Sequence, residues 1–418
     1  MKTLRQYQID LSKQAAQILL SKKIVYLAME VRTGKTSTAL EIAKIVGAKD
    51  VLFITKKKAI SSIMSDYKDF CYTFDITVIN NESLHLVVSN TYDLIISDEH
   101  HRNGAFPKMN KATQILKDNY SHLPMIFLSG TPTPESYSQI FNQFHVSKFS
   151  PFAQYANFYK WAKDYVIITN KNLGYAQVND YSNARQDLIK PILAAYMVIF
   201  TQQQAGFTSA VSEHILECEL KQETYLLIER LKKNLVIEGK NEVILADTGV
   251  KLMGKLHQMY SGTVKFESGK SMILDDAKAQ FILNYFKGQK IAIFYKFKEE
   301  FEMLKNVFQN NLCSDLDIFN NTDKNIALQI ISGREGISLK AAKYLVYINI
   351  DFSSVSYWQS RDRLTVMDRL ANDIFYVFAR DGIEKKIYKC VLDKKDYTLS
   401  QFRQDDRTTN TKQNHQKA

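Results

Sequence analysis

Short apolar runs alternate with amphipathic stretches through the first 165 residues of the chain. Runs rich in branched or aromatic residues, most of them followed by polar or glycine-containing turns, are predicted to be strands. They lie at residues 24–29, 51–55, 76–79, 94–97 and 125–128. Helical patterns at 36–45 and 59–70 lie between them. This rhythm is typical of a parallel sheet that is covered by helices on both faces.

The alternation stops at residue 166 and returns at 271. Residues 166–270 carry long helical patterns at 182–195 and 222–238, with one short apolar run at 197–200, and are predicted to be a linker and a mostly helical insertion. Residues 271–395 again alternate helices with strands. The helices are expected at 277–286 and 298–308, and the strands at 290–295, 327–331, 344–350 and 373–379. The fold class is therefore α/β, with parallel-sheet lobes at 1–165 and 271–395 and a polar tail at 396–418.

Composition narrows the class of protein. With 45% hydrophobic residues the chain is globular, and no apolar run approaches the length of a membrane span. We expect a cytoplasmic protein, in the host cytoplasm if a phage encodes it. The four cysteines form no CxxC pair, so we expect reduced and mostly buried thiols. A net charge of +11 fits a polyanionic partner such as nucleic acid, although a generally basic proteome would explain it equally well.

A candidate phosphate site follows the first predicted strand. Residues 30–36 read Glu-Val-Arg-Thr-Gly-Lys-Thr and lead into a helical pattern, and a glycine turn at a helix start presents backbone N–H groups to phosphate. Lys35 is expected to reach the β- and γ-phosphates, and Thr36 to bind Mg²⁺. The predicted nucleotide site also includes Arg32, Thr33, Gly34 and Ser37. Met29 or Glu30 stands where the full P-loop pattern has its first glycine, so a chance Gly-Lys-Thr is the alternative.

A pair of carboxylates follows the predicted strand at 94–97. At the carboxyl end of a parallel strand, Asp98 is expected to hold Mg²⁺ and Glu99 to polarise the attacking water. A surface pair at the start of a loop is the alternative, but the position after the phosphate loop favours a Walker-B role. His100 and His101 are adjacent and point in different directions, which argues against a metal site there.

Together with further motifs in the same order, these residues resemble the superfamily II helicases, in particular their Swi/Snf-like branch and phage-type DEAD/DEAH-like ATPases. The motifs of the first lobe are residues 4–8 (Leu-Arg-Gln-Tyr-Gln), 30–36, 53–57, 80–84, 98–101 and 128–132 (Leu-Ser-Gly-Thr-Pro). The resemblance implies that Gln8 reads the adenine edge. It also implies that Thr55, Lys56 and Asn81 contact the nucleic-acid backbone, while Ser129 and Thr131 sense the motif II carboxylates.

The second lobe carries the motifs that would complete the site. Residues 331–339 resemble motif V, which implies nucleic-acid contacts from Ser332 and Gly333 and a phosphate contact from Gly336. Residues 358–363 resemble motif VI, which implies catalytic roles for Gln359 and Arg363. The family's second arginine falls at Val366, so the arginine finger stays open among Arg363, Arg369 and Arg361.

The resemblance implies two RecA-like lobes that hydrolyse ATP with Mg²⁺ and move along or unwind DNA. Duplex DNA is expected as the partner in preference to single strands or RNA, and the chain is expected to be a monomer with possible partner proteins of replication or recombination. The alternatives are a passive DNA-binding module derived from such a motor, and the motor subunit of a restriction or repair complex.

Overall fold

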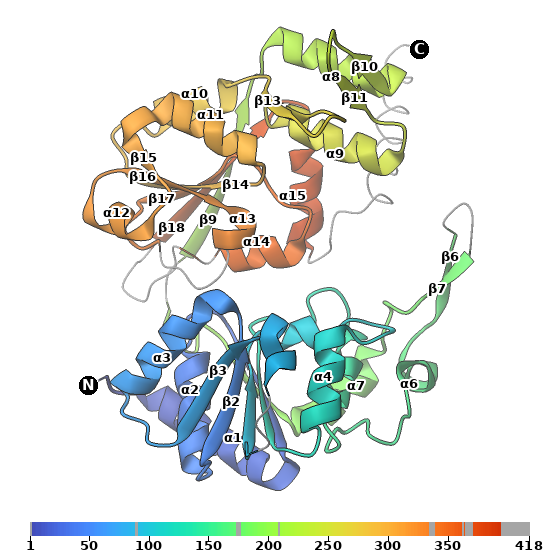
Figure 1. The fold of residues 1–418 in the computed structure, drawn as a ribbon, viewed down its shortest axis with the longest axis vertical. Coiled ribbons are helices and arrows are strands. Elements are labelled where there is room, and N and C mark those ends of the chain that lie inside the picture. Colours follow the sequence, from blue (N-terminus) through green and yellow to red (C-terminus); the bar gives the residue numbers. More distant parts are fainter. Residues whose placement is uncertain are drawn as a thin grey trace. The chain divides into compact units, whose positions relative to one another are not determined.

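The computed structural model describes residues 2–87, 91–172, 177–207, 210–333, 339–361, 363 and 371–393. The chain divides into two compact units, residues 1–207 and 208–418. Each unit is built on a six-stranded sheet in which all strand pairs are parallel. The predicted pair of parallel-sheet lobes is therefore confirmed (Figure 1).

The sheet of unit 1 has the strand order β3-β2-β4-β5-β1-β8. Its strands are β1 (Ile24–Met29), β2 (Asp50–Thr55), β3 (Asp75–Asn80), β4 (Leu94–Ser97), β5 (Met125–Leu128) and β8 (Met197–Phe200). The helices are α1 (Gln6–Lys22), α2 (Lys35–Ile45), α3 (Ile60–Asp69), α4 (Lys111–Tyr120), α5 (Gln139–His145), α6 (Phe158–Tyr165) and α7 (Gln186–Ala194). The short 3₁₀ helices are η1 (Lys57–Ala59), η2 (Asn81–Leu86) and η3 (His100–Asn103). A small antiparallel hairpin joins β6 (Thr169–Asn172) to β7 (Gln177–Asp180).

Successive side chains of β1 point to opposite faces of the sheet, and both faces are covered by helices. Val25, Leu27 and Met29 pack with α1 and α2 on one face, while Tyr26 and Ala28 pack with α5 and its neighbours on the other. All six residues of the strand are buried. A strand that is buried on both faces reads as a continuous apolar run, which is the pattern that predicted it.

The sheet of unit 2 has the strand order β15-β16-β14-β17-β18-β9. Its strands are β9 (Ala210–Cys218), β14 (Ile291–Tyr295), β15 (Leu312–Cys313), β16 (Asn325–Gln329), β17 (Tyr344–Tyr347) and β18 (Ala371–Ala379). The helices are α8 (Gln222–Asn234), α9 (Gly249–Tyr260), α10 (Ala277–Tyr285), α11 (Lys298–Phe308), α12 (Leu316–Asn321), α13 (Ile330–Gly333), α14 (Ser354–Arg361) and α15 (Glu384–Leu392), with the 3₁₀ helix η4 (Gln309–Asn311). Two short hairpins pair β10 (Val236–Glu238) with β11 (Val243–Leu245) and β12 (Thr263–Lys265) with β13 (Ser271–Ile273).

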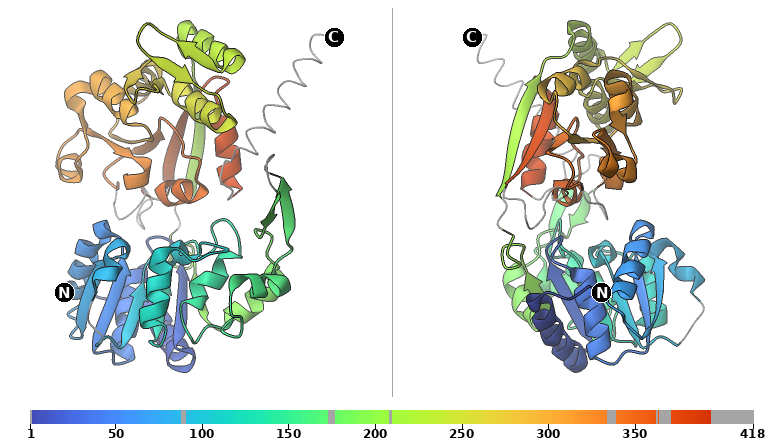
Figure 2. Two further views of the ribbon diagram at one scale, coloured as in Figure 1. Left: turned by 45° about the vertical axis from the view of Figure 1, so that its right-hand side comes forward. Right: turned by 90° about the vertical axis from the view of Figure 1, so that its left-hand side faces the viewer.

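The segment at 166–270 is divided between the two units. Its helices α7 and α8 lie where helices were expected, and α9 is a further helix that was not expected. The segment also contributes strands to both large sheets. β8 pairs with β1, and β9 pairs along its whole length with β18 (Figure 2). The segment is therefore less helical than expected, and the unit boundary lies at residues 207 and 208. The local pattern does not show this, because the partners of β8 and β9 lie more than 150 residues away in the sequence.

Two other expectations need correction. The strand predicted at 327–331 ends at Gln329, and the chain turns into α13, which buries Ile330 and exposes Ile331. The cysteines are less buried than expected: Cys218 is buried, Cys313 and Cys390 are half-buried and Cys71 is exposed. Within the described ranges, no helix has both the length and the hydrophobicity needed to cross a membrane.

Candidate nucleotide site and its surroundings

Gly34 stands at the turn between β1 and α2, in a conformation that favours glycine. Its φ is +83°, and a Cβ atom added there would lie 2.0 Å from Nε2 of Gln8. Gln8 has little room to retreat, because it is 7% exposed and its Oε1 accepts a hydrogen bond from the backbone N–H of Arg5. The turn therefore brings α1, which carries Gln8, against the first residues of α2.

Hydrogen bonds within the turn hold Lys35 close to the end of β1. Its Nζ donates to the carbonyl oxygens of Met29 (2.9 Å) and Glu30 (3.1 Å). The buried Thr33 hydroxyl also donates to the Glu30 carbonyl (2.7 Å). From α1, the Tyr7 hydroxyl donates to the carbonyl of Thr33 (3.2 Å). Four hydrogen bonds thus stabilise the loop around the Lys35 ammonium.

Asp98 follows β4 at the carboxyl edge of the same sheet. Its carboxylate accepts hydrogen bonds from the Thr55 hydroxyl (2.8 Å) and the Glu99 backbone N–H (2.9 Å). Burial, and then the neighbouring charge of Glu99, raise the pKa of Asp98 to about 6, while Thr55 and the charge of Lys35 act in the opposite direction. The Asp98 carboxyl therefore holds its proton more tightly than an exposed aspartate does, and it lies within electrostatic reach of the Lys35 ammonium.

The two histidines after Glu99 have different structural roles. The ring of His100 stacks on Phe127, and burial lowers its pKa to about 3, so the ring is neutral. Its Nε2–H donates to the Gln143 carbonyl (2.9 Å), and Nδ1 accepts from the Ser97 hydroxyl (2.8 Å).

His101 instead connects the carboxylates to the strand end at β5. Its Nδ1 lies 2.9 Å from the Ser129 hydroxyl and 3.3 Å from a carboxylate oxygen of Glu99. The same Ser129 oxygen accepts from the backbone N–H of Thr131 (3.0 Å). The loops after β4 and β5 therefore share one hydrogen-bonded network, in which His101 lies between Glu99 and Ser129.

The other residues predicted in the first lobe take varied positions. Thr55 is only 1% exposed and bonds to Asp98, so its side chain lies beside the carboxylates and not on the surface where a DNA contact was expected. The Asn81 amide donates to the Thr55 carbonyl (3.3 Å), and Lys56 is half-buried. At the start of α2, Ser37 is buried, while Arg32 and Thr36 are half-buried.

In unit 2, helix α14 carries the residues predicted as motif VI. Gln359 is 5% exposed, and its side-chain oxygen has no hydrogen-bond partner within the described part of the chain. The Nε–H of Arg363 donates to the Gln359 carbonyl (3.0 Å). Ser332 and Gly333 end the short helix α13, whereas Gly336, Val366 and Arg369 lie outside the described residues.

Arg361 has a different environment, which sequence reasoning missed. Its Nε–H donates to Glu213 on β9 (2.8 Å), and its guanidinium lies over the ring of Trp358. The hydroxyls of three tyrosines donate to the same Glu213 carboxylate. They belong to Tyr357 (2.8 Å), Tyr376 (3.0 Å) and Tyr388 (2.9 Å). Arg361 is therefore held inside unit 2 by an ion pair.

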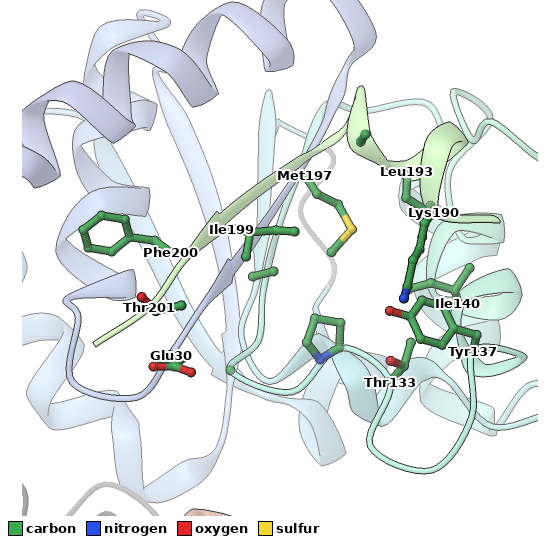
Figure 3. A pocket seen from close by; sticks show the side chains of 14 residues that line it. Glu30, Thr133, Tyr137, Ile140, Lys190, Leu193, Met197, Ile199, Phe200 and Thr201 are labelled. Carbon is green, nitrogen blue, oxygen red and sulfur yellow. The ribbon is translucent and has the colours of Figure 1, made fainter. Parts of the chain in front are cut away.

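A pocket of about 370 Å³ lies beside the phosphate loop, on the face of the sheet that carries α5 and α7. Glu30 and Thr201 lie at one end of it, Tyr137 and Lys190 lie at the other, and Met197 is among the apolar side chains between them (Figure 3). The carboxyl ends of β1 and β8 therefore both border this pocket, and sequence patterns did not indicate that they are close together.

No protein-family model matches the sequence, and no curated protein matches it. Among solved structures, the chain is similar to the Sulfolobus solfataricus SWI2/SNF2 ATPase core in complex with double-stranded DNA. The identity is 15% and the TM-score 0.42, over 94% of this chain and 91% of the other. It is also similar to the Sulfolobus solfataricus SWI2/SNF2 ATPase core domain, with 15% identity and a TM-score of 0.41 over 94% and 89% of the chains.

Proposed function

We propose that this chain is a nucleic-acid-stimulated ATPase that translocates along duplex DNA. The observation that carries the proposal is the assembly at the carboxyl edge of the first sheet. There the Lys35 loop, the Asp98–Glu99 pair and Ser129 come from three different strand ends and lie within one electrostatic and hydrogen-bonded neighbourhood. Ligands of parallel α/β sheets bind at this edge.

The side chains of unit 1 fit a nucleotide with Mg²⁺. Gly34 has a positive φ at a helix start, where backbone N–H groups can approach phosphate, and Lys35 places its ammonium inside the turn. Asp98 supplies buried carboxyl oxygens and Thr36 supplies a hydroxyl, and oxygen donors of this kind suit Mg²⁺. When bound, the metal ion would neutralise charge on the phosphates.

The protein groups then have separate tasks in hydrolysis. Lys35 stabilises negative charge on the phosphates, and Glu99 takes a proton from the attacking water. His101 holds Glu99 in position and links it to Ser129, so the state of the carboxylates is relayed to the loop after β5. Gln359 and Arg363 are the groups of unit 2 that we assign to the transition state. The ion pair of Arg361 with Glu213 supports Arg363 over Arg361 as the finger.

DNA is the proposed partner, and contacts to phosphates supply most of the affinity. The net charge of +11 supports this, together with Lys56, Asn81, Ser332 and Gly333 as contact residues. Binding that relies on phosphate contacts should weaken steeply as salt is raised and should depend little on base sequence.

The test is phosphate release from ATP with no polynucleotide, with single-stranded DNA, with duplex DNA and with RNA. We expect stimulation by duplex DNA, and loss of turnover in Lys35→Ala, which removes the ammonium from the loop. Stimulation by single strands or RNA alone would instead indicate an unwinding helicase. No turnover under any condition, with DNA binding intact, would replace the proposal with the passive binding module.

A further inference from the structure

The last segment of unit 1, residues 201–207, contacts the first residues of the phosphate loop. After β8 ends at Phe200, residues 201–207 form a turn that is held by its own hydrogen bonds, including Ala205 N–H to the Thr201 carbonyl (3.1 Å) and Phe207 N–H to the Gln202 carbonyl (3.0 Å). Ala205 is buried in the core of unit 1. Residue 207 is the last of unit 1, and β9 of the second sheet begins at Ala210. This turn is therefore the covalent exit toward unit 2.

Three hydrogen bonds join the exit segment to the first residues of the phosphate loop. The Glu30 N–H donates to the Phe200 carbonyl (2.9 Å) and continues the β1–β8 ladder. The Gln202 N–H donates to the Glu30 carboxylate (2.7 Å), and the Gln202 side-chain amide donates to the Val31 carbonyl (3.0 Å). Figure 3 shows Glu30 and Thr201 at the same end of the pocket.

One of the two residues that Gln202 contacts, Glu30, is also an acceptor of Lys35. Glu30 accepts from the Lys35 ammonium through its carbonyl oxygen and from Gln202 through its carboxylate. A displacement of the exit segment would therefore shift an acceptor of Lys35 as well. The Glu30 side chain thus makes a contact with the exit segment that a glycine at this position could not make.

We propose that Gln202 and Glu30 are positioning residues for the phosphate loop, so that nucleotide binding and the path of the chain toward unit 2 are thermodynamically linked. This inference rests on the proposed function, because it assumes that the loop binds nucleotide. Linkage is reciprocal: if an ordered exit segment strengthens nucleotide binding, then bound nucleotide must order the exit segment to the same extent.

The first test measures ATP affinity in full-length variants by titration with a fluorescent ATP analogue. Gln202→Ala removes one donor to the loop and is expected to weaken binding about threefold to tenfold, which corresponds to one hydrogen bond. Gln202→Glu has the same size but places a carboxylate against the Val31 carbonyl, and should weaken binding at least as much. Gln203→Ala is the matched control, because this neighbouring glutamine is exposed and makes no side-chain hydrogen bond among the described residues. It should bind ATP as the wild type does.

Two further readouts separate positioning from a general loss of structure. The unfolding temperature of Gln202→Ala without nucleotide should be lower than that of the wild type by no more than the few degrees that one lost hydrogen bond explains. Hydrogen exchange of amides 202–207 in the wild type should slow when ATP is added. Equal ATP affinity in wild type and Gln202→Ala, or exchange at 202–207 that ATP does not change, would overturn the linkage. A wild type that binds no ATP would overturn the proposed function itself, and this outcome is distinct because it is seen before any variant is compared.

Discussion

Replacement of Glu213 by glutamine is expected to destabilise unit 2 strongly. One carboxylate on β9 receives hydrogen bonds from three tyrosine hydroxyls and from the Nε–H of Arg361 (2.8 Å), and the Glu213 side chain is only 13% exposed. The donors come from α14, β18 and α15, which lie far from β9 in the sequence. The carboxylate therefore joins four elements at a single point.

The expected loss of folding free energy in Glu213→Gln follows from the number and kind of hydrogen bonds that the substitution removes. Glutamine keeps one acceptor oxygen but turns an NH₂ group toward hydroxyl and guanidinium donors, so about half of the contacts lose their acceptor. The partner Arg361 is 21% exposed and would lose its counter-charge. Removing one partner of a largely buried ion pair costs about 3–5 kcal/mol, and the hydrogen bonds of the tyrosines to a charged group are part of that loss.

The assay is urea unfolding of the full chain followed by tryptophan fluorescence. The chain has two tryptophans, of which Trp358 lies beside Arg361 in unit 2 and Trp161 lies in the core of unit 1. A Trp161→Phe background therefore restricts the signal to unit 2. Glu217→Gln on the same strand is the matched control. Its partner Lys385 is 40% exposed, and an exposed pair of this kind contributes about 0–1 kcal/mol.

Equal decreases in the free energy of unfolding for Glu213→Gln and Glu217→Gln would contradict this expectation. In that case the four donors to Glu213 would be satisfied equally well by an amide, and the carboxylate charge would not stabilise unit 2.

The remaining predictions concern the phosphate loop and a buried histidine. Gly34→Ala should weaken binding of an ATP analogue at least about tenfold, because position 34 combines a positive φ with a Cβ contact of 2.0 Å to Gln8. Gly47→Ala is the control, because Gly47 also has a positive φ (+71°) but no atom within 4 Å of its Cβ position, and it should bind the analogue normally. Equal affinities of the two variants would exclude the steric explanation. In unit 2, burial holds the pKa of His257 well below its ordinary value, so only the unfolded chain takes up its proton as pH falls below about 6.5. The free energy of unfolding of the wild type should therefore decrease as the pH falls. In urea unfolding between pH 7.5 and 5, the plot of this free energy against pH should be shallower for His257→Gln than for the wild type, by up to about 1.4 kcal/mol per pH unit. Parallel plots would show that the native state binds this proton as readily as the unfolded chain does.

Much of the candidate site could be predicted because its signals are local. The apolar runs at β1, β2, β4 and β5 were recognised from side-chain type alone, and a polar group directly after a parallel strand must lie at the carboxyl edge of the sheet. Lys35, Asp98 and Ser129 follow three such strands. The structure adds the contacts between them, which depend on the strand order and not on the strands themselves.

Roles that depend on distant partners could not be predicted in this way. Thr55 resembled a DNA contact, but its hydroxyl is directed to Asp98 because β2 and β4 are neighbours. Arg361 stays one of the predicted candidates for the arginine finger, and the sequence did not show its ion pair with Glu213, 148 residues earlier.

The sequence by itself therefore determined the two α/β lobes, most of their strands and helices, and the residue types at the phosphate loop. These features depend on periodicity and on neighbours within a few residues. Only the tertiary structure decided that β8 closes the first sheet, that β9 belongs to the second, and that Gln202 meets Glu30. Sheet pairing and side-chain hydrogen bonds join residues that are far apart along the chain, and a local pattern of polar and apolar positions carries no record of those partners.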